Sequence, residues 1–181
     1  QANSGDIDLI YSLADKIWRA HYPSIISIEQ IDYMLTMMYS KEALLQQMSE
    51  GQHFLLAFHG EIPVGYISYS IKNKGEYFLH KFYVDTNRHR AGIGSVFFNQ
   101  VFNGFEDLES IRLTVNRKNY KAINFYFKQG FIIEEVKDFA RAWCGVGAVG
   151  ELGLPPRRMC FPRVGHGVAS PRVQCRRHNN S

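Results

Sequence analysis

The sequence predicts an α+β fold, and three observations lead to this prediction. The first 50 residues place apolar side chains at the three-and-four spacing of amphipathic helices. From residue 53 this spacing gives way to the β-branched and aromatic runs that are typical of strands. After residue 92, helix-like and strand-like runs alternate as far as residue 136. We therefore expect a mixed, mostly antiparallel sheet flanked by helices, with later strands connected through helices.

The N-terminal part is predicted to contain three helices. The first helix has apolar residues on one face and is expected to be capped by Ser4 or Asp6. The third helix is expected to end before Gly51. These helices are expected at residues 6–20, 28–39 and 41–48.

Strands are predicted from residue 53 onward. The first two are joined by His59-Gly60-Glu61, which is typical of a hairpin. The strands are expected at residues 53–58, 62–71, 77–84, 111–115 and 131–136, and two further helices at residues 93–102 and 119–128.

Length and composition limit the class of protein. A chain of 181 residues suits a single domain with one core. No apolar run reaches the roughly 18 residues of a membrane span, and no signal peptide pattern stands at the start. The first 139 residues contain no cysteine, which fits a reducing compartment. We therefore expect a cytoplasmic protein without a membrane partner.

The composition divides the chain after residue 139. Residues 1–139 hold fourteen Lys and Arg against sixteen Asp and Glu, whereas residues 140–181 hold seven Arg, no Lys and one acid, Glu151. The second part is rich in Gly, Pro and Arg and keeps neither helical nor strand spacing. We expect a folded domain over residues 1–139 and a separate tail. We hypothesise that this tail is out of frame or foreign; a disordered basic arm and an atypical subdomain are the alternatives.

The tail gives little support for other functions. Its arginines could contact nucleic acid, but only Trp143 and Phe161 are available to stack on bases. Its three cysteines, Cys144, Cys160 and Cys175, form no Cys-x-x-Cys pair of the kind that zinc sites use. We predict no metal site and do not favour nucleic acid as a partner.

A glycine-rich turn, His-Arg-Ala-Gly-Ile-Gly at residues 89–94, stands between a predicted strand and a predicted helix. Such a turn presents backbone N–H groups at the positive end of a helix dipole and can bind a phosphate. The Rossmann pattern does not fit because Phe97 replaces a small residue, and a P-loop would need a lysine before Ser95. A tight connection with solvated arginines is the alternative interpretation.

A second block follows at residues 119–131, with the pattern Asn-x-x-Ala-x-x-x-Tyr-x-x-x-Gly-Phe. Together with the glycine turn, and in the same order of strands and helices, it resembles the GCN5-related N-acetyltransferase (GNAT) superfamily over roughly residues 2–139. The resemblance implies the fold of that family. It also implies transfer of an acetyl group from acetyl-CoA to a primary amine, by direct attack in a ternary complex.

The resemblance also shows where the two ends of the chain depart from the family. A first strand usually precedes the first helix, and residues 2–6 look like its end, so this strand is expected to be truncated. A final strand should close the sheet, but residues 158–164 are short and interrupted by Pro162. We therefore expect the final strand to be missing or replaced.

By resemblance, the glycine turn binds the pyrophosphate of the cofactor. Backbone N–H groups around Arg90, Gly92, Gly94 and Ser95 would form this grip, with the glycines allowing a close approach. His89 occupies a position where the family usually has Gln or Arg. This departure weakens the match at one position.

Three more residues are assigned to the cofactor by resemblance. Backbone groups of Phe82 and Val84 would bind the pantetheine arm, and the Val84 amide could also polarise the thioester carbonyl. As side chains, the same two residues fit the core. Asn119 matches the family's cofactor-contacting asparagine and is equally suited to be a helix N-cap.

Tyr126 matches the general acid of the family, which returns a proton to the leaving thiolate. A phenol with an ordinary pKa of about 10 carries that proton at neutral pH. Core packing beside Phe125, Phe127 and Phe131 is the alternative role.

The general base is less well determined. His80 lies on the strand where related enzymes often place a carboxylate or a water-holding group, and an ordinary imidazole has a suitable pKa. A partly exposed strand histidine is the alternative. Glu76 and Asp85 bracket the strand and could cap turns, and the base could act through water.

The first two helices and their connection would choose the acceptor, again by resemblance. This region is rich in aromatic and methionine side chains, which could form an apolar wall but serve more commonly as core. The residues are Trp18, His21, Tyr22, Tyr33, Met34, Met37, Met38 and Tyr39. The pattern resembles the branch with spermidine acetyltransferases, so the acceptor is expected to be a small amine, a polyamine or a protein lysine.

A non-catalytic acyl-CoA sensor is the main alternative function. Such a protein would keep Gly92, Gly94 and Asn119 but would have lost Tyr126. The tyrosine is present, so the sequence favours an enzyme. It gives no indication of oligomeric state.

Overall fold

The structure of the chain is a computed structural model that describes residues 1–85, 92–138 and 171–178. In these ranges, none of the helices combines the length and the apolar character that crossing a bilayer requires. The chain divides into two compact units, one over residues 1–111 and one over residues 112–178. The predicted boundary after residue 139 falls where the described residues stop, so it stays a prediction.

The three N-terminal helices are confirmed. A short 3-10 turn, η1 (Ser4–Asp6), leads into α1 (Ile7–His21), followed by α2 (Ile28–Tyr39) and α3 (Lys41–Ser49). The predicted cap needs a correction, because Asn3 caps the 3-10 turn and accepts a hydrogen bond from Gly5 N at 2.7 Å. The Asp6 carboxylate accepts from the Asn3 backbone N–H instead of capping α1.

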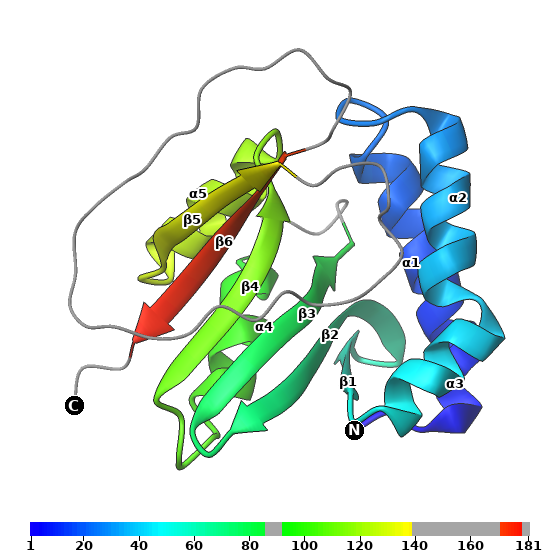
Figure 1. The fold of residues 1–181 in the computed structure, drawn as a ribbon. Coiled ribbons are helices and arrows are strands. Elements are labelled where there is room, and N and C mark those ends of the chain that lie inside the picture. The colour runs from blue at the N-terminus through cyan, green and yellow to red at the C-terminus, as the bar shows by residue number, and fades with distance from the viewer. Residues whose placement is uncertain (86–91, 139–170, 179–181) are drawn as a thin grey trace. The chain divides into compact units, whose positions relative to one another are not determined.

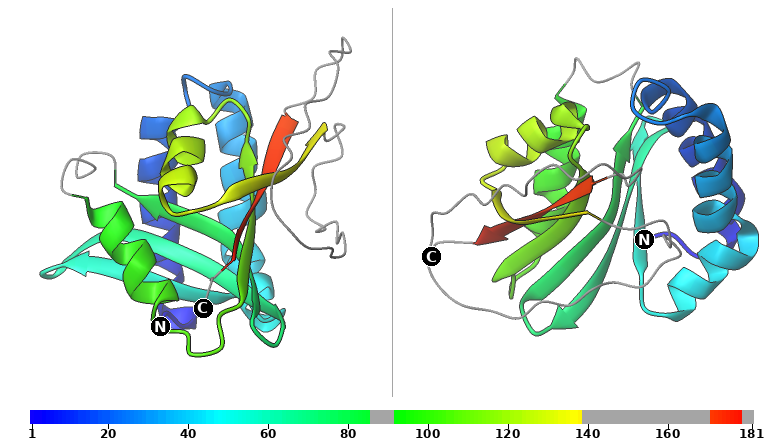
Figure 2. Two further views of the ribbon diagram at one scale, coloured as in Figure 1. Left: turned by 90° about the vertical axis from the view of Figure 1, so that its left-hand side faces the viewer. Right: turned by 45° about the horizontal axis from the view of Figure 1, so that its top comes forward.

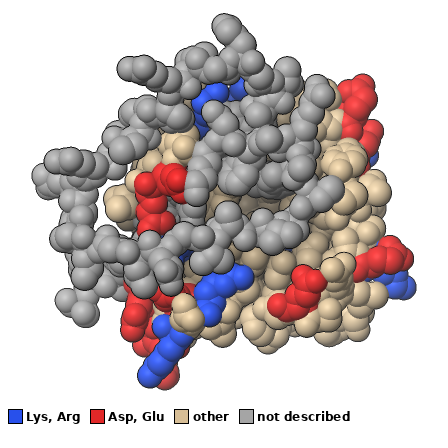
Figure 3. Space-filling model, in the orientation of Figure 1, with Lys and Arg blue, Asp and Glu red and all other residues tan. Residues whose placement is uncertain are grey.

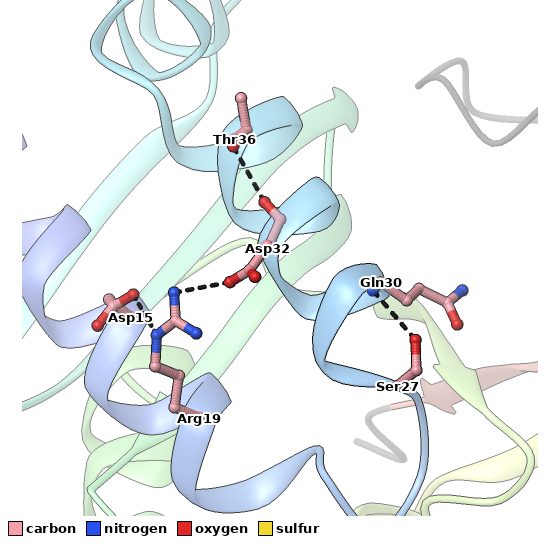
Figure 4. A network of polar contacts seen from close by, with 6 residues as sticks. All are labelled: Asp15, Arg19, Ser27, Gln30, Asp32 and Thr36. Atoms are coloured by element: carbon pink, nitrogen blue, oxygen red, sulfur yellow. Dashed lines mark hydrogen bonds and ion pairs between the residues drawn. The ribbon is translucent and has the colours of Figure 1, made fainter.

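Polar contacts between α1 and α2 involve Arg19, as Figure 4 shows. Its guanidinium bonds the carboxylates of Asp15, one turn earlier on α1, and Asp32 of α2, at 2.8 Å each. The N-terminus of α2 is capped by Ser27, whose Oγ accepts from Gln30 N at 3.2 Å. The Arg19 pairs therefore link the outer surfaces of two helices whose apolar faces form part of the core.

Three strands of the first unit form an antiparallel meander, drawn at the lower centre of Figure 1. They are β1 (His53–His59), β2 (Ile62–Asn73) and β3 (Glu76–Val84), in the order of the chain. The predicted hairpin and both neighbouring strands are thus confirmed. The Ala2 N–H donates to the Phe54 carbonyl of β1 at 2.8 Å, although residues 1–3 form no strand.

A β-bulge interrupts the pairing of β2 with β3. Ser68 is paired with Lys81, but the next residue, Tyr69, is paired with Leu79. His80 therefore has no partner in the register. An extra residue of this kind reverses the alternation of side chains beyond it.

The bulge decides which side chains of β3 meet which helices. Tyr83 lies on the face covered by α1, with its ring centroid 5.9 Å from that of Trp18. Phe82 points to the opposite face and lies 5.7 Å from Phe98 of α4 (Ile93–Phe102), again between ring centroids. The helices α1 to α3 and α4 thus cover opposite faces of the first unit's strands, as the two views of Figure 2 show.

Lys81 is buried beneath the N-terminal helices, with 4 % of its surface exposed. Its ammonium donates to the Gln47 side chain of α3, which in turn donates to the Met38 carbonyl of α2 at 2.9 Å. The rings of Tyr39 and Phe54 lie 5.4 and 5.5 Å from Nζ. Burial lowers the pKa of Lys81 to about 7.

The second unit contains most of β4 (Ser110–Asn116), α5 (Tyr120–Lys128), β5 (Ile132–Asp138) and β6 (Pro171–His178). Its strand order is β4-β6-β5, and β5 pairs with β6 in antiparallel fashion. The fold class is therefore α+β, as predicted, and the elements up to β5 begin and end within two residues of the predicted bounds.

The final strand was expected to be missing or replaced, and the first of these alternatives is wrong. The structure has a strand, β6, in that place, paired with β5 from Ile132↔Arg176 to Asp138↔Pro171. The sequence did not reveal it because the stretch begins with proline and contains three arginines, which are poor strand signals. The proposed frame shift after residue 139 stays untested.

Replacing Lys81 by methionine should flatten the pH dependence of stability. The folded pKa of about 7 lies below the ordinary value of 10.5, so between these values the unfolded chain binds a proton that the folded chain does not. Wild-type stability should therefore rise with pH over this window, by about 1 kcal/mol per pH unit from this group. Urea unfolding at pH 7 and pH 9 measures the slope.

Lys41→Met, at an exposed position on α3, is the matched control and should keep the wild-type slope. Parallel pH profiles for the wild type and Lys81→Met would contradict the lowered pKa of the buried Lys81.

Candidate active site

Helix α4 begins at Ile93, and its N-cap is Gly92 of the predicted glycine turn. Gly92 has a φ of 68°, in the left-handed region that glycine adopts at little cost. Its carbonyl accepts from Val96 N at 3.1 Å and so starts the helix. As the N-cap residue, Gly92 has no side chain with which to cap this helix, unlike Ser27 at α2 and Ser40 at α3.

An anion fits this helix start. Backbone N–H groups of the first turn, which include those of Gly94 and Ser95, point out of the N-terminus and carry its positive dipole. Among the described residues, no heavy atom lies within 4 Å of a Cβ added at Gly92. His89 and Arg90, the other predicted residues of the grip, lie outside the described residues. The geometry at α4 suits a phosphate group.

Strand β3 leads toward this turn and is held at its end. Val84 pairs with Gly65 of β2, and the next residue, Asp85, donates its N–H to the Val64 carbonyl at 2.8 Å. The Asp85 carboxylate is buried and lies 2.6 Å from Nζ of Lys16 on α1. An ion pair with a buried carboxylate thus fixes the strand end from which the chain enters the turn.

Phe82 and Val84 have the core side chains that the sequence predicted. Phe82 packs between strand and helix beside Phe97 and Phe98, with centroids 6.1 and 5.7 Å away. Val84 is 7 % exposed. Their proposed cofactor contacts are made by backbone atoms, so this packing and the predicted role are compatible.

His80 occupies the bulge and faces Ser70 of β2. Its Nε2 lies 2.8 Å from Ser70 Oγ, and its ring lies 4.8 Å from that of Phe78. Burial, followed by the nearby charges of Lys81 and Lys72, lowers the pKa of His80 to about 3. The imidazole is therefore neutral at physiological pH and a weaker base than the sequence alone suggested.

The second unit contains the other predicted residues. Asn119 is the N-cap of α5, and its side chain accepts from Ala122 N at 3.1 Å. Tyr126 lies on the buried face of this helix, with its ring 5.3 Å from that of Phe131. Both alternative roles that the sequence left open, capping for Asn119 and packing for Tyr126, are therefore real. They do not exclude a role at the cofactor.

The structure groups the predicted residues in two sets. The first set lies in the first unit. It contains three residues of β3, which are His80, Phe82 and Val84, and three at the start of α4, which are Gly92, Gly94 and Ser95. Asn119 and Tyr126 share α5 in the second. The bulge and the burial of Lys81 were not predicted from the sequence; the adjacent polar pair His80-Lys81 inside an otherwise apolar strand is the signal that points to them.

The described surface shows mixed charge. In the view of Figure 3, acidic and basic side chains are interspersed around uncharged areas. Of the three tail cysteines, Cys175 lies in β6, and Cys144 and Cys160 lie outside the described residues.

Comparison with known families decides the class of this site. Residues 25–145, which include β3, the start of α4 and all of α5, match the model of the acetyltransferase (GNAT) domain. The chain belongs to the GNAT family. It is an N-acetyltransferase of this family, and the family uses acyl-CoA.

The chain is also similar to individual proteins. The chain is similar to the spermidine N(1)-acetyltransferase of Thermoplasma acidophilum, with 29 % identity over 138 residues that cover 72 % of this chain and 84 % of the relative. A solved structure of the PaiA N-acetyltransferase of Thermoplasma acidophilum in complex with coenzyme A has a TM-score of 0.70 at 20 % identity, with 98 % and 96 % of the two chains covered. The Ard1 structure of Thermoplasma volcanium has a TM-score of 0.65 at 19 % identity, covering 100 % and 96 %. These structures confirm the predicted GNAT fold.

Replacing Gly92 by alanine should destabilise this GNAT domain and weaken its binding of coenzyme A. The left-handed backbone at Gly92 should cost alanine about 1 kcal/mol, with no steric clash added. Any relaxation of this strain shifts the first N–H groups of α4, and with them the proposed phosphate contact. Urea unfolding measures the first effect, and calorimetry with coenzyme A measures the second.

Gly104→Ala is the control, because Gly104 does not have a left-handed φ and an added Cβ would lie 3.5 Å from its nearest neighbours. Equal changes in stability and affinity for the two variants would argue against a special role of Gly92.

Proposed function

We propose that this GNAT enzyme transfers an acetyl group from acetyl-CoA to a primary amine by direct attack in a ternary complex. In this reaction the neutral amine nitrogen forms a bond to the acetyl carbonyl carbon, and the carbon–sulfur bond breaks. The thiolate takes up one proton, and the amine gives up one. The observation that carries the proposal is the left-handed glycine at the start of α4, the next described element after strand β3, in a chain that matches the GNAT domain.

Binding of the cofactor's pyrophosphate is the best supported part of the proposed function. The backbone N–H groups at Gly92, Gly94 and Ser95 suit the pyrophosphate, with His89 and Arg90 as further proposed contacts. Backbone groups of Phe82 and Val84 would bind the pantetheine arm, and the Val84 N–H would polarise the acetyl carbonyl. The neighbour solved with coenzyme A supports this class of ligand.

Tyr126 is our proposed general acid, and Asn119 a further cofactor contact. A tyrosine hydroxyl can donate its proton to the departing thiolate, which has an ordinary pKa near 8.5. Burial on α5 would exclude water from such a transfer. The buried position supports this role but serves packing equally well.

The acceptor is proposed to be a small primary amine, with polyamines among the candidates. Support comes from the relative named as a spermidine N(1)-acetyltransferase. A protein lysine has the same reacting group and is the other candidate. All these acceptors must lose a proton before attack, because an ammonium nitrogen has no free electron pair.

Calorimetry with acetyl-CoA, followed by a thiol-release screen over amines, tests the proposed function. The screen should include spermidine, short alkylamines and a lysine peptide. We expect binding of acetyl-CoA and amine-dependent release of coenzyme A. A folded sample that neither binds acetyl-CoA nor releases coenzyme A with any of the amines would contradict the proposed function.

Tyr126→Phe should lower kcat by about 100-fold, because the variant keeps the ring but loses the donated proton. Affinity for acetyl-CoA, measured by calorimetry, should stay the same. Tyr120→Phe is the matched control on the same helix, since Tyr120 is 71 % exposed and its hydroxyl has no proposed role. Similar kcat values for the two variants would refute a catalytic hydroxyl at Tyr126.

His80 remains our candidate base, acting through water as a neutral imidazole. His80→Gln should lower kcat/KM by about tenfold, less than the roughly 100-fold or more of a well-matched general base, because the lowered pKa makes the ring a weak proton acceptor. With a pKa of about 3 the ring stays neutral from pH 5 upward, so its titration should leave no inflection in the rate profile near pH 6.5.

Rate profiles between pH 5 and pH 9 for the wild type and His80→Gln test both statements. An inflection near pH 6.5 that disappears in the variant would contradict the lowered pKa. Unchanged kcat/KM would contradict the role as base.

A further inference from the structure

Gly65 of β2 lies directly opposite the strand end on which the proposed cofactor contacts depend. It pairs with Val84 of β3, and its neighbour Val64 accepts the Asp85 N–H at 2.8 Å. A Cβ added at Gly65 would lie 2.5 Å from the Tyr83 carbonyl oxygen and 3.2 Å from Val84 Cα. Real Cβ atoms essentially never lie within 3.0 Å of another heavy atom, so a side chain at this position must displace the backbone of β3.

The close approach of β3, rather than backbone freedom, requires glycine at this position. Gly65 does not have a left-handed φ, unlike Gly60 and Gly75 in the turns before and after β2. Alanine could therefore adopt the same backbone conformation, and only the contact with β3 excludes it. A glycine inside a strand weakens the strand and often marks a place where another backbone comes close. At Gly65 that backbone is the Tyr83–Val84 peptide.

The Tyr83–Val84 peptide points its carbonyl toward β2 and its N–H away from β2. The Asp85 N–H points toward β2, because it donates to the Val64 carbonyl. Successive N–H groups along a strand point to opposite sides, so the Val84 N–H points away from β2. A trans peptide directs its carbonyl opposite to its N–H, which agrees with the short contact between the Tyr83 oxygen and a Cβ at Gly65.

This peptide contains a group that the proposed reaction uses. The Val84 N–H is the proposed donor to the acetyl carbonyl, and such a donor acts only when it lies close to the place where the oxyanion forms. The peptide unit is planar, so a push on the Tyr83 oxygen also moves the Val84 hydrogen. A misplacement of about 1 Å can reduce a rate by roughly 100-fold. Space at Gly65 therefore affects the chemistry without a direct contact.

The strand is held on both sides of this contact, so it cannot easily move away as a whole. Before the contact, Tyr83 pairs with Tyr66, whose ring is fully buried and lies 5.3 Å from the Tyr83 ring. After the contact, the Asp85 carboxylate lies 2.6 Å from Nζ of Lys16. A side chain at Gly65 should therefore tilt the peptide between these two fixed points.

We propose that Gly65 is a positioning residue for acetyl transfer, because its lack of a side chain lets β2 and β3 come close enough to direct the Val84 N–H at the thioester carbonyl. This inference rests on the proposed acetyl transfer. Gly65 acts through the Tyr83–Val84 peptide and is not proposed to contact the cofactor or the amine. Even alanine, the smallest side chain, should not replace it.

Gly65→Ala in the full chain should lower kcat by about 100-fold, the size expected for a displaced oxyanion donor. Binding of coenzyme A, measured by calorimetry, should weaken by less than about tenfold, because coenzyme A has no acetyl carbonyl and keeps its proposed contacts at α4. A loss of stability alone would not separate kcat from Kd in this way. Urea unfolding shows that each variant is folded under the assay conditions.

Two variants serve as controls. Gly104→Ala adds a Cβ that lies 3.5 Å from its nearest neighbours, which is ordinary contact. Ile10→Val removes a methyl group from a fully buried side chain on α1 and so tests the effect of lost stability alone. Both should keep the wild-type kcat. A kcat of Gly65→Ala equal to that of these controls would overturn the inference.

Amide NMR tests the same geometry without catalysis. In the isotope-labelled full chain, Gly65→Ala should shift the Val84 amide signal, and Gly104→Ala should not. In the wild type, acetyl-CoA should shift the Val84 signal more than coenzyme A does, because only acetyl-CoA has the carbonyl that accepts from this N–H. The wild-type measurement needs no variant, so it tests the inference even if Gly65→Ala does not fold.

The outcomes distinguish this inference from the proposed function. A wild type that shows the larger Val84 shift with acetyl-CoA, but acetylates no amine, would overturn the proposed function alone. Acetyl transfer by Gly65→Ala at the wild-type kcat would overturn this inference alone. Equal shifts of the Val84 signal with acetyl-CoA and coenzyme A would also overturn it, because the peptide that Gly65 positions would then have no contact with the acetyl group.

Discussion

The one-residue bulge in β3 is the constraint on which the candidate active site depends. If His80 instead took a regular place in the ladder, every side chain after it would point to the other face of the strand. Tyr83 would then face α4, and Phe82 would face the N-terminal helices. The bulge thus allows a single strand to direct core side chains toward α4 and polar aromatic ones toward α1.

Buried polar contacts hold the bulged strand in one register. Lys81, the residue after the bulge, reaches Gln47 on α3, and Gln47 reaches the Met38 carbonyl on α2. A buried lysine is costly, so removal of any partner should be more disruptive than the loss of a surface contact. At the end of the strand the Lys16–Asp85 ion pair connects β3 to α1. Helices and strand are therefore linked at two points, on either side of the residues proposed to contact the cofactor.

Much of this fold could be predicted from the sequence, because each helix has its own apolar face and each strand up to β5 has its own run of β-branched and aromatic residues. The three-and-four spacing at Ile10, Leu13 and Ile17 predicts α1, and all three side chains are buried. The glycine turn at Gly92 was predicted from its place between strand and helix, and its left-handed φ confirms why glycine stands there. Local patterns of this kind need no knowledge of distant partners.

The features that escaped prediction depend on contacts between distant residues. The pKa of His80 cannot be read from the strand itself, because it is burial that lowers it to about 3. Lys81 would ordinarily be expected at the surface, and only its place under α2 and α3 makes it a buried amine. Strand β6 depends on pairing with β5, since its own sequence has weak strand propensity.

The central claim is that coenzyme A binds to the backbone of β3 and to the start of α4. Hydrogen–deuterium exchange of the full chain, with and without saturating coenzyme A, tests it most directly, because it reports on backbone amides. We expect slower exchange in peptides that contain residues 82–84 and 93–96, with no comparable change in β1. Binding of coenzyme A that leaves both β3 and the first turn of α4 unprotected would contradict it.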